Sequence, residues 1–207
     1  MAVERRVERR RAATREKLVN TALALFATHG IYDATVEDIT EAADVGKGTF
    51  YQHFPSKTVI IHHLLHDGIS ELLDRCRREG RLAGTDKERV KRLLSAQFRF
   101  FDERPDLLIL FHQVRGLLKL KPPDVRSLQK EYDRYIRFLA AELGASLDRR
   151  RYSRARLMQM ACAMAGLVAG YLSYRMILGL KKHGATDLEV PTRLFLEGIA
   201  TNGQAML

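Results

Sequence analysis

Apolar side chains recur along most of the chain at intervals of three and four residues, which is the spacing of one face of an α-helix. The first such face consists of Leu18, Ala22, Leu25 and Phe26, and Gly30 follows it as a residue that readily caps a helix in the left-handed conformation. No stretch alternates cleanly between apolar and polar residues, as a half-buried strand would. The pattern therefore predicts an all-α fold.

Two short helices are expected next. Thr35 stands before an apolar pattern and has Asp38 three residues later, which is close to a capping box at a helix start. After a break at residues 44–46, a second short helix is expected to extend to His53, because Pro55 disfavours the α conformation just before it. Two helices joined by such a tight turn form a helix-turn-helix unit, whose second helix can enter the DNA major groove.

Longer helices are expected in the rest of the chain. Ser56 can cap one that extends to about Gly80. The same periodicity predicts the others at Asp86–Glu103, Asp106–Lys119, Asp124–Leu143, Ser153–Lys181 and Thr192–Asn202. The breaks between them are assigned to Pro105, Pro122-Pro123, Gly144 and Pro191. Three short helices would thus precede a larger helical bundle.

Composition narrows the class of protein. The 207 residues are 46% hydrophobic and 29% charged, which suffices for a folded core. With two cysteines, Cys76 and Cys162, a disulfide framework and a four-cysteine zinc site are both excluded. The first seventeen residues carry seven cations and no apolar segment, so we expect no secretory signal and a cytoplasmic protein.

The formal net charge of +10 suggests nucleic acid as a partner but does not locate the contact. Residues 1–57 contain nine Lys plus Arg and eight Asp plus Glu, a net charge of only +1. Their cations gather in a basic N-terminal arm, Arg5–Lys17, and at Lys47 and Lys57. We hypothesise that the arm follows phosphates or enters a minor groove, two alternatives that the sequence leaves open.

The second short helix carries the candidate chemistry. Phe50 and Phe54 are four residues apart and are expected to face Ile39 and the first helix. This leaves one cation, two hydroxyls, an amide and an imidazole on the outer side, from Lys47, Thr49, Tyr51, Gln52 and His53. Such groups suit hydrogen bonding to phosphates and to base edges.

Two further residues are explained by a nearby nucleic-acid backbone. Gly48 costs about 1 kcal/mol relative to alanine inside a helix, and close approach to a backbone would justify it. Lys57 stands in the first turn of the next helix, where a cation opposes the helix dipole. A neighbouring phosphate would explain that placement.

Residues 15–57 resemble the DNA-binding head of the tetracycline-repressor (TetR) family of bacterial regulators. The matching residues are Ala22-Leu23-Ala24-Leu25-Phe26, Gly30, Ala34-Thr35-Val36, Ile39, Ala42-Ala43, Val45, Lys47-Gly48-Thr49-Phe50-Tyr51, His53-Phe54 and Lys57. The chain departs from the family at Asp44, where Gly is frequent, at Gly46, where a capping Ser is usual, and at Gln52, where a basic residue is frequent. The resemblance implies an N-terminal three-helix helix-turn-helix head followed by a C-terminal helical bundle.

The resemblance also implies which residues meet DNA. In that family the positions of Thr35, Tyr51, His53 and Lys57 commonly touch the DNA backbone. The positions of Lys47, Gly48 and Thr49 approach phosphates or base edges. The implied DNA-binding residues are therefore Thr35, Lys47, Gly48, Thr49, Tyr51, Gln52, His53 and Lys57.

The resemblance further implies a DNA-binding domain at 1–57 and a ligand-sensing and dimerisation domain at 58–207. The implied function is that of a transcriptional regulator without enzymatic activity or cofactor. It would be a homodimeric repressor, released from a palindromic double-stranded DNA operator by a small apolar or amphipathic effector. The candidate ligand-binding residues are Phe98, Phe101, Phe111, His112, Tyr135, Met164 and Tyr171. The candidate dimer residues are Cys162, Gly166, Gly170, Ser173, Phe195 and Ile199.

Several alternatives stay open beside this interpretation. His62 and His66 are four residues apart on one helix face, which suits two imidazole ligands of a metal-responsive regulator, but no third ligand has a compelling spacing. Cys76 lies among charged residues and is a candidate redox-responsive thiol, with a buried, inert cysteine as the other interpretation. Residues 157–174 carry no charge, yet their small and polar members favour packing in a soluble bundle over a membrane span. An enzyme built on the bundle is the last alternative.

Overall fold

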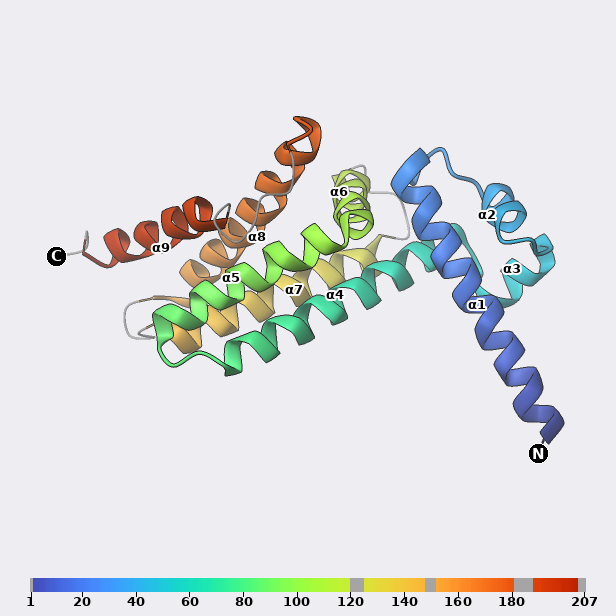
Figure 1. Cartoon of the computed structure of the whole chain (residues 1–207), viewed down its shortest axis with the longest axis horizontal. Helices are drawn as coiled ribbons and strands as arrows, with labels where there is room; N and C mark the ends of the chain where they lie inside the picture. The colour runs from blue at the N-terminus through green and yellow to red at the C-terminus, as the bar shows by residue number, and fades with distance from the viewer. Residues whose placement is uncertain (1, 120–124, 148–151, 181–187, 205–207) are drawn as a thin grey trace. The chain divides into compact units, whose positions relative to one another are not determined.

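The computed structural model describes residues 2–119, 125–147, 152–180 and 188–204 (Figure 1). Within these ranges every regular element is a helix, which confirms the all-α prediction. The helices are α1 Ala2–His29, α2 Val36–Ala42, α3 Lys47–His53, α4 Lys57–Arg81, α5 Asp86–Glu103, α6 Pro105–Lys119, α7 Arg126–Ser146, α8 Arg154–Ile177 and α9 Glu189–Gln204.

The chain divides into two compact units. The first comprises Met1–Gly68 and Asp106–Gln129, and the second comprises Ile69–Pro105 and Lys130–Leu207. α4 contributes residues to both units. The sequence-based division at 57/58 separates functions rather than compact units, and it stays a prediction.

The first unit is built around α1, α2, α3, α6 and the first half of α4. Its core consists of fully buried apolar side chains that include Leu18, Phe26, Ile39, Phe50 and Ile60. These residues are the apolar positions of the helical pattern, so burial of one face of each helix holds the unit together.

Within this unit Gln113 of α6 forms hydrogen bonds to two backbone groups that lie 82 and 87 residues away in the sequence. The Nε2 atom of Gln113 donates to the carbonyl oxygen of Phe26 at 2.8 Å, and its Oε1 atom accepts from the backbone N–H of Ile31 at 2.9 Å. The same side chain therefore serves the last turn of α1 and the loop that follows Gly30, whose φ is +91°. Periodicity alone did not identify this residue.

The second unit packs α5, α7, α8, α9 and the rest of α4. α8 buries one stripe of side chains, namely Ala161, Met164, Val168, Leu172 and Arg175. These positions recur at intervals of three and four residues, as expected for a helix packed on one side. By length and composition alone α8 is apolar enough to cross a membrane, with a mean hydropathy of 1.3 in its most apolar window and 22% of that window buried.

Some predicted helix boundaries were wrong for identifiable reasons. α1 begins at Ala2, because the charged arm is helical although it has no apolar face. Gly144 does not end α7: a Cβ atom there would lie 2.9 Å from Cδ1 of Leu157, so this glycine permits close packing instead. Pro191 lies in the first turn of α9, where a missing N–H costs no helical hydrogen bond. The predicted start at Asp124 lies outside the described residues, and the helix predicted to extend to Lys181 ends earlier, at Ile177.

Candidate nucleic-acid interface

The start of α2 is fixed by a reciprocal cap. The Thr35 hydroxyl accepts from the Asp38 N–H at 3.1 Å, and the Asp38 carboxylate accepts from the Thr35 N–H at 2.7 Å. The Thr35 N–H and hydroxyl hold the pKa of Asp38 below its usual range. The predicted capping box is thus confirmed, with aspartate in the place of the more usual glutamate.

The turn between α2 and α3 contains two of the three residues at which the sequence departs from the family that it resembles, Asp44 and Gly46. Asp44 adopts a φ of +49°, the left-handed conformation that a short polar side chain tolerates. Gly46 is the N-cap of α3 and offers no side-chain hydrogen bond. Replacing a capping side chain by glycine costs only a few tenths of a kcal/mol, so α3 still forms.

α3 presents two distinct faces. Its inner face carries Phe50, which is 0% exposed, and leads to Phe54 at the C-cap, with 6.0 Å between the ring centroids. Its outer face leaves Lys47, Gly48, Tyr51 and Gln52 exposed and Thr49 and His53 half-buried. A Cβ atom on Gly48 would meet nothing within 4 Å, so no packing inside the chain requires glycine there. The predicted burial of Phe50 and Phe54 is confirmed, and so is the exposure of three of the five residues predicted to lie outside, Lys47, Tyr51 and Gln52.

Lys47 has an acidic partner that sequence reasoning missed. Its ammonium group forms an ion pair with the Glu37 carboxylate in the first turn of α2, and both side chains are exposed. The hydrogen bond from Lys47 is the main cause that lowers the pKa of Glu37. Any phosphate that binds Lys47 competes with this carboxylate.

Lys57 is engaged inside the chain. Its Nζ atom donates to the carbonyl oxygens of Ala34 at 2.9 Å and Tyr32 at 3.3 Å. Burial lowers the pKa of Lys57, and the nearby carboxylates of Asp33 and Asp38 oppose that shift. The cation at the start of α4 therefore fastens the α1–α2 loop, and a phosphate contact by Lys57 stays a prediction.

The C-terminal end of α3 meets cations of α1. The Arg15 guanidinium lies 5.0 Å from the centroid of the Phe54 ring, and its Nη1 atom lies 3.0 Å from Nε2 of His63 on α4. Burial lowers the pKa of His53, and the charges of Arg11 and Arg15 lower it further. α1, α3 and α4 are thus joined at one point of the head.

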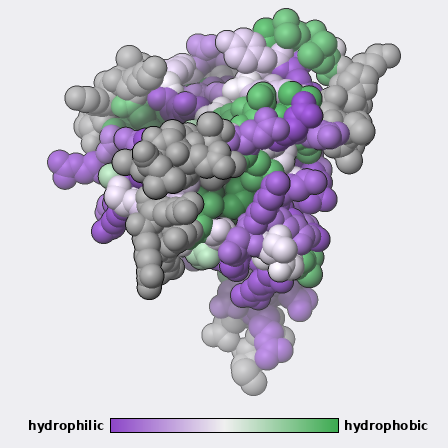
Figure 2. Space-filling model, turned by 90° about the vertical axis from the view of Figure 1, so that its left-hand side faces the viewer, coloured by the Kyte–Doolittle hydropathy of each residue, from purple (hydrophilic) through white to green (hydrophobic). Residues whose placement is uncertain are grey.

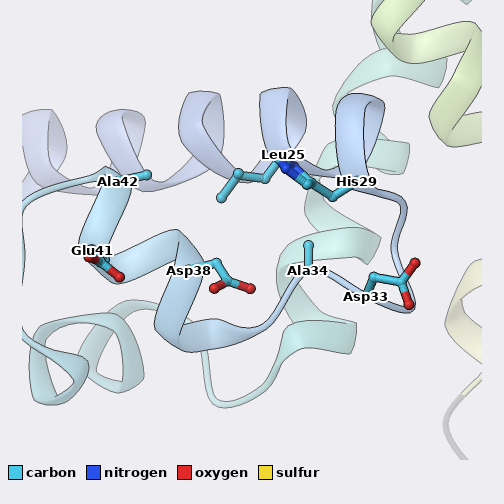
Figure 3. Close-up of a pocket in the computed structure, with 7 residues that line it drawn as sticks. All are labelled: Leu25, His29, Asp33, Ala34, Asp38, Glu41 and Ala42. Carbon is cyan, nitrogen blue, oxygen red and sulfur yellow. The ribbon is translucent and has the colours of Figure 1, made fainter.

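Acidic side chains gather between the end of α1 and α2. A hollow between the end of α1 and α2 is lined by Leu25, His29, Asp33, Ala34, Asp38, Glu41 and Ala42 (Figure 3). Its carboxylates would repel phosphate groups. A polyanion is therefore expected to meet the α3 side of the head rather than this hollow.

The candidate ligand residues fall in both units. Phe111 and His112 belong to the first unit and the other candidates to the second. Phe98 and Tyr171 make an edge-on ring contact with 5.6 Å between centroids. The hydroxyl of Tyr135 donates to Oε1 of buried Gln97 at 2.6 Å. Phe101 and Met164 are buried.

The candidate dimer residues lie on α8 and α9. Cys162 and Gly166 are exposed, and Gly170 and Ser173 are half-buried, on the face of α8 away from its buried stripe. A Cβ atom on either glycine would meet nothing within 4 Å. Phe195 is half-buried on α9, while the side chain of Ile199 lies outside what the structure describes.

The histidine and cysteine alternatives receive no support. The rings of His62 and His66 lie 6.1 Å apart, centroid to centroid. Among the described residues no group of three His, Cys, Asp or Glu side chains is placed to hold a metal ion. Cys76 is 1% exposed, and burial raises the pKa of its thiol to about 12, which favours the interpretation as a buried, inert cysteine.

Comparisons with known proteins point in the same direction as this geometry. Residues 18–64 match the family described as "Bacterial regulatory proteins, tetR family". The "Probable acrEF/envCD operon repressor" of Escherichia coli is 43% identical over 51 residues, which are 25% of this chain and 23% of that protein. The "HTH-type transcriptional repressor KstR2" of Mycobacterium tuberculosis is 28% identical over 108 residues, 52% of this chain and 54% of that one. The chain thus matches no more than about half the length of these relatives.

Solved structures share the whole fold. FadR from Bacillus subtilis, in complex with stearoyl-CoA, superposes with a TM-score of 0.71 at 18% identity over 88% of this chain and 95% of that one. The TetR family transcriptional regulator PfmR from Thermus thermophilus gives a TM-score of 0.66 at 19% identity over 88% and 95%. The family match is confined to the head, residues 18–64, which resemble the "Bacterial regulatory proteins, tetR family", and the solved structures share the fold.

Proposed function

We propose that the protein is a DNA-binding transcriptional regulator that acts as a homodimeric repressor and leaves its operator when a small apolar or amphipathic molecule binds. The observation that carries the DNA-binding role is the two-faced α3. Phe50 and the C-cap residue Phe54 are buried, while Tyr51 and Gln52 are exposed. Hydroxyl, amide and ammonium groups on a short exposed helix can hydrogen-bond to phosphates and base edges.

The proposal is tested by binding to duplexes from the DNA upstream of the protein's own gene, measured by fluorescence anisotropy. Gln52→Ala is expected to cost about 1–3 kcal/mol of discrimination between the bound duplex and unrelated DNA if Gln52 reads a base. Tyr51→Phe is the companion variant, because it keeps the ring and removes only a hydroxyl that would reach phosphate. This variant should weaken binding to all duplexes by the same factor. Wild-type protein that shows no preference among duplexes would contradict the proposal.

The effector is proposed from the chemistry of the second unit. Most of the buried side chains described in this unit are apolar, and Tyr135 and Gln97 form a buried hydrogen-bonded pair among them. In support, the related fold of Bacillus subtilis FadR was solved with stearoyl-CoA, an amphipathic molecule. Stearoyl-CoA and free stearate are therefore the first probes to add to the DNA-binding assay. A coupled effector is expected to change the DNA dissociation constant about 5- to 150-fold.

Glu37→Gln is expected to tighten DNA binding. Glu37 and a DNA phosphate compete for the Lys47 ammonium, and an exposed ion pair of this kind is weak. Removing the carboxylate should thus lower the dissociation constant by about fivefold at most. The control is Glu41→Gln, which removes the same charge from α2 without touching the pair. Equal effects of the two variants would show that net charge matters and the pair does not.

Two-fold association through α8 and α9 would cover apolar surface that is open in the single chain. Seven of the large exposed hydrophobic side chains lie close together in the sequence, namely Tyr174, Met176, Ile177, Leu178, Leu180, Val190 and Leu194. Figure 2 views the molecule from the left-hand side of Figure 1, where α9 is labelled. Hydrophobic surface is visible there among hydrophilic side chains. The glycines of α8 would let a partner helix approach closely.

Gly166→Leu is expected to convert the dimer into folded monomers. A Cβ atom at this exposed position meets nothing within 4 Å in the chain, and leucine improves helix propensity by up to about 1 kcal/mol, so the monomer should not be destabilised. Between two facing helices the same side chain would force the backbones apart. Light scattering after size exclusion gives the mass. Gly116→Leu is the matched control, an exposed helical glycine of α6, and its mass should equal that of the wild type. Dimeric Gly166→Leu would refute the assignment.

A further inference from the structure

α1 continues far beyond the three-helix head. The first core residue of the head on this helix is Leu18, so Ala2–Lys17 form an extension of sixteen residues, about 24 Å at 1.5 Å per residue. Figure 1 shows this blue segment projecting past α3 toward the N-terminus. We call residues 2–17 the basic extension.

The basic extension is charged on all sides. From residue 5 to residue 17 every side chain is exposed except that of Thr14, which is half-buried. The cations of the extension are Arg5, Arg6, Arg9, Arg10, Arg11, Arg15 and Lys17, against the acids Glu4, Glu8 and Glu16. Between residues 5 and 17 the one large apolar side chain is Val7, itself 60% exposed. Without an apolar face, the extension suits neither a partner helix nor insertion into a membrane surface.

The root of the extension is fastened beside α3. Arg15 stacks on the Phe54 ring at the C-cap of α3 and contacts His63 of α4. Arg11, one turn earlier, lies close enough for its charge to act on His53. The direction of the extension relative to α3 is therefore set by the head and not by a loose linker.

We propose that the basic extension binds, as a rigid helix, to the phosphate backbone of the same DNA duplex outside the stretch contacted by α3. The proposal rests on the DNA-binding function proposed above. A helix with its side chains is about 10–12 Å wide, whereas the minor groove of B-DNA is about 6 Å wide. The extension therefore follows phosphates along a groove edge and does not enter the minor groove. Charge complementarity identifies the occupant, since an exposed arginine row matches a row of phosphates.

The test replaces Arg5, Arg6, Arg9 and Arg10 by glutamine, which keeps the helix and removes four charges. Each lost phosphate contact makes the dependence of log K on log salt less steep by about 0.9. We expect a loss of two to four such contacts per protomer. The affinity for specific and for unrelated duplexes should fall by the same factor. The control is a variant in which four exposed cations of the second unit become glutamine, namely Arg78, Lys87, Lys91 and Lys130. It carries the same net charge and should keep the wild-type slope.

Rigidity is tested separately with Ala12→Pro, against Ala12→Ser. Proline at this exposed position keeps every cation but breaks the helix between the extension and the head. If the helix must be continuous, Ala12→Pro lowers the slope as the glutamine variant does. A wild-type slope with Ala12→Pro would mean that a flexible basic tail suffices, and the rigid-helix proposal would be wrong.

The outcomes distinguish the proposed DNA-binding function from the proposed role of the basic extension. Wild-type protein that binds no duplex overturns the DNA-binding function itself. Wild-type protein that binds DNA, together with a glutamine variant of unchanged slope, overturns only the role of the extension. Anionic vesicles of phosphatidylserine and phosphatidylcholine serve as the competing partner. If the four substitutions abolish vesicle binding and leave DNA binding unchanged, the extension is a membrane contact and the proposal fails.

Discussion

Replacing Phe50 by alanine is expected to destabilise the DNA-binding head by about 3–5 kcal/mol, the usual cost of truncating a buried phenylalanine. Phe50 is fully buried and its ring contacts those of Phe54 and Tyr51. The residue sits on a helix of seven residues, which has too few hydrogen bonds to persist without its apolar anchor. The loss approaches the total stability of a small unit, about 5–15 kcal/mol. DNA binding should disappear with it.

Hydrogen exchange followed by mass spectrometry is the suitable measurement, because a chain of two compact units need not unfold in one step. Amides of α2 and α3 should exchange much faster in Phe50→Ala, while those of α5 and α7 should not change. Tyr51→Phe is the control, since it keeps the ring against Phe50 and alters only an exposed hydroxyl. The free energies of amide opening obtained from its exchange rates should match those of the wild type within about 0.5 kcal/mol. Unchanged protection of α3 in Phe50→Ala would show that its ring does not anchor the helix.

The parts of the head that could be predicted are those determined by neighbouring residues. The Thr35–Asp38 cap, the break at residues 44–46 and the inward Phe50 each depend on residues within about one helical turn. Capping and turn geometry are local, and periodicity states which face of a helix is buried. The same reasoning placed Tyr51 and Gln52 on the outside of α3.

Contacts between distant residues could not be predicted in this way. The Lys57 ammonium reaches carbonyl oxygens 23 and 25 residues earlier in the chain. Glu37 and Lys47 belong to different helices, and their pairing depends on the angle of the turn between them. No pattern of residue types within one helix records such an angle. The sequence therefore identified these cations as candidates for phosphate contacts without identifying their present partners.

The helical state of the basic extension was missed for a different reason. Periodicity detects a helix by its buried face, and the extension has none. Arginine and alanine nevertheless have high helix propensity, and the extension continues a helix that is already nucleated by the packed residues from Leu18 onward. Residues that extend an existing helix avoid the free-energy cost of forming a new helical nucleus. A charged segment next to an amphipathic helix is therefore better judged by propensity than by periodicity.

Gln113→Leu is expected to loosen the loop between α1 and α2. The substitution keeps the approximate volume of the side chain but removes the acceptor for the Ile31 N–H and one of the donors to the Phe26 carbonyl. Ile31 is buried, and a buried donor left without a partner costs about 1–3 kcal/mol. The Phe26 carbonyl keeps the N–H of Gly30 at 3.1 Å, so most of the loss should arise at Ile31.

Three variants divide this effect between the two hydrogen bonds. Gln113→Glu keeps an acceptor for the Ile31 N–H and loses the donor to the Phe26 carbonyl, so it should destabilise less than Gln113→Leu. Gln129→Leu changes an exposed glutamine of the same unit and should have no effect. The readout is the exchange rate of the amides from Ile31 to Thr35, where the loop passes the Lys57 ammonium and enters the cap of α2. Equal exchange in Gln113→Leu and Gln129→Leu would show that Gln113 does not hold the loop. Faster exchange confined to Gln113→Leu would mean that a residue of α6 controls the segment that positions α2 and, through the turn, α3.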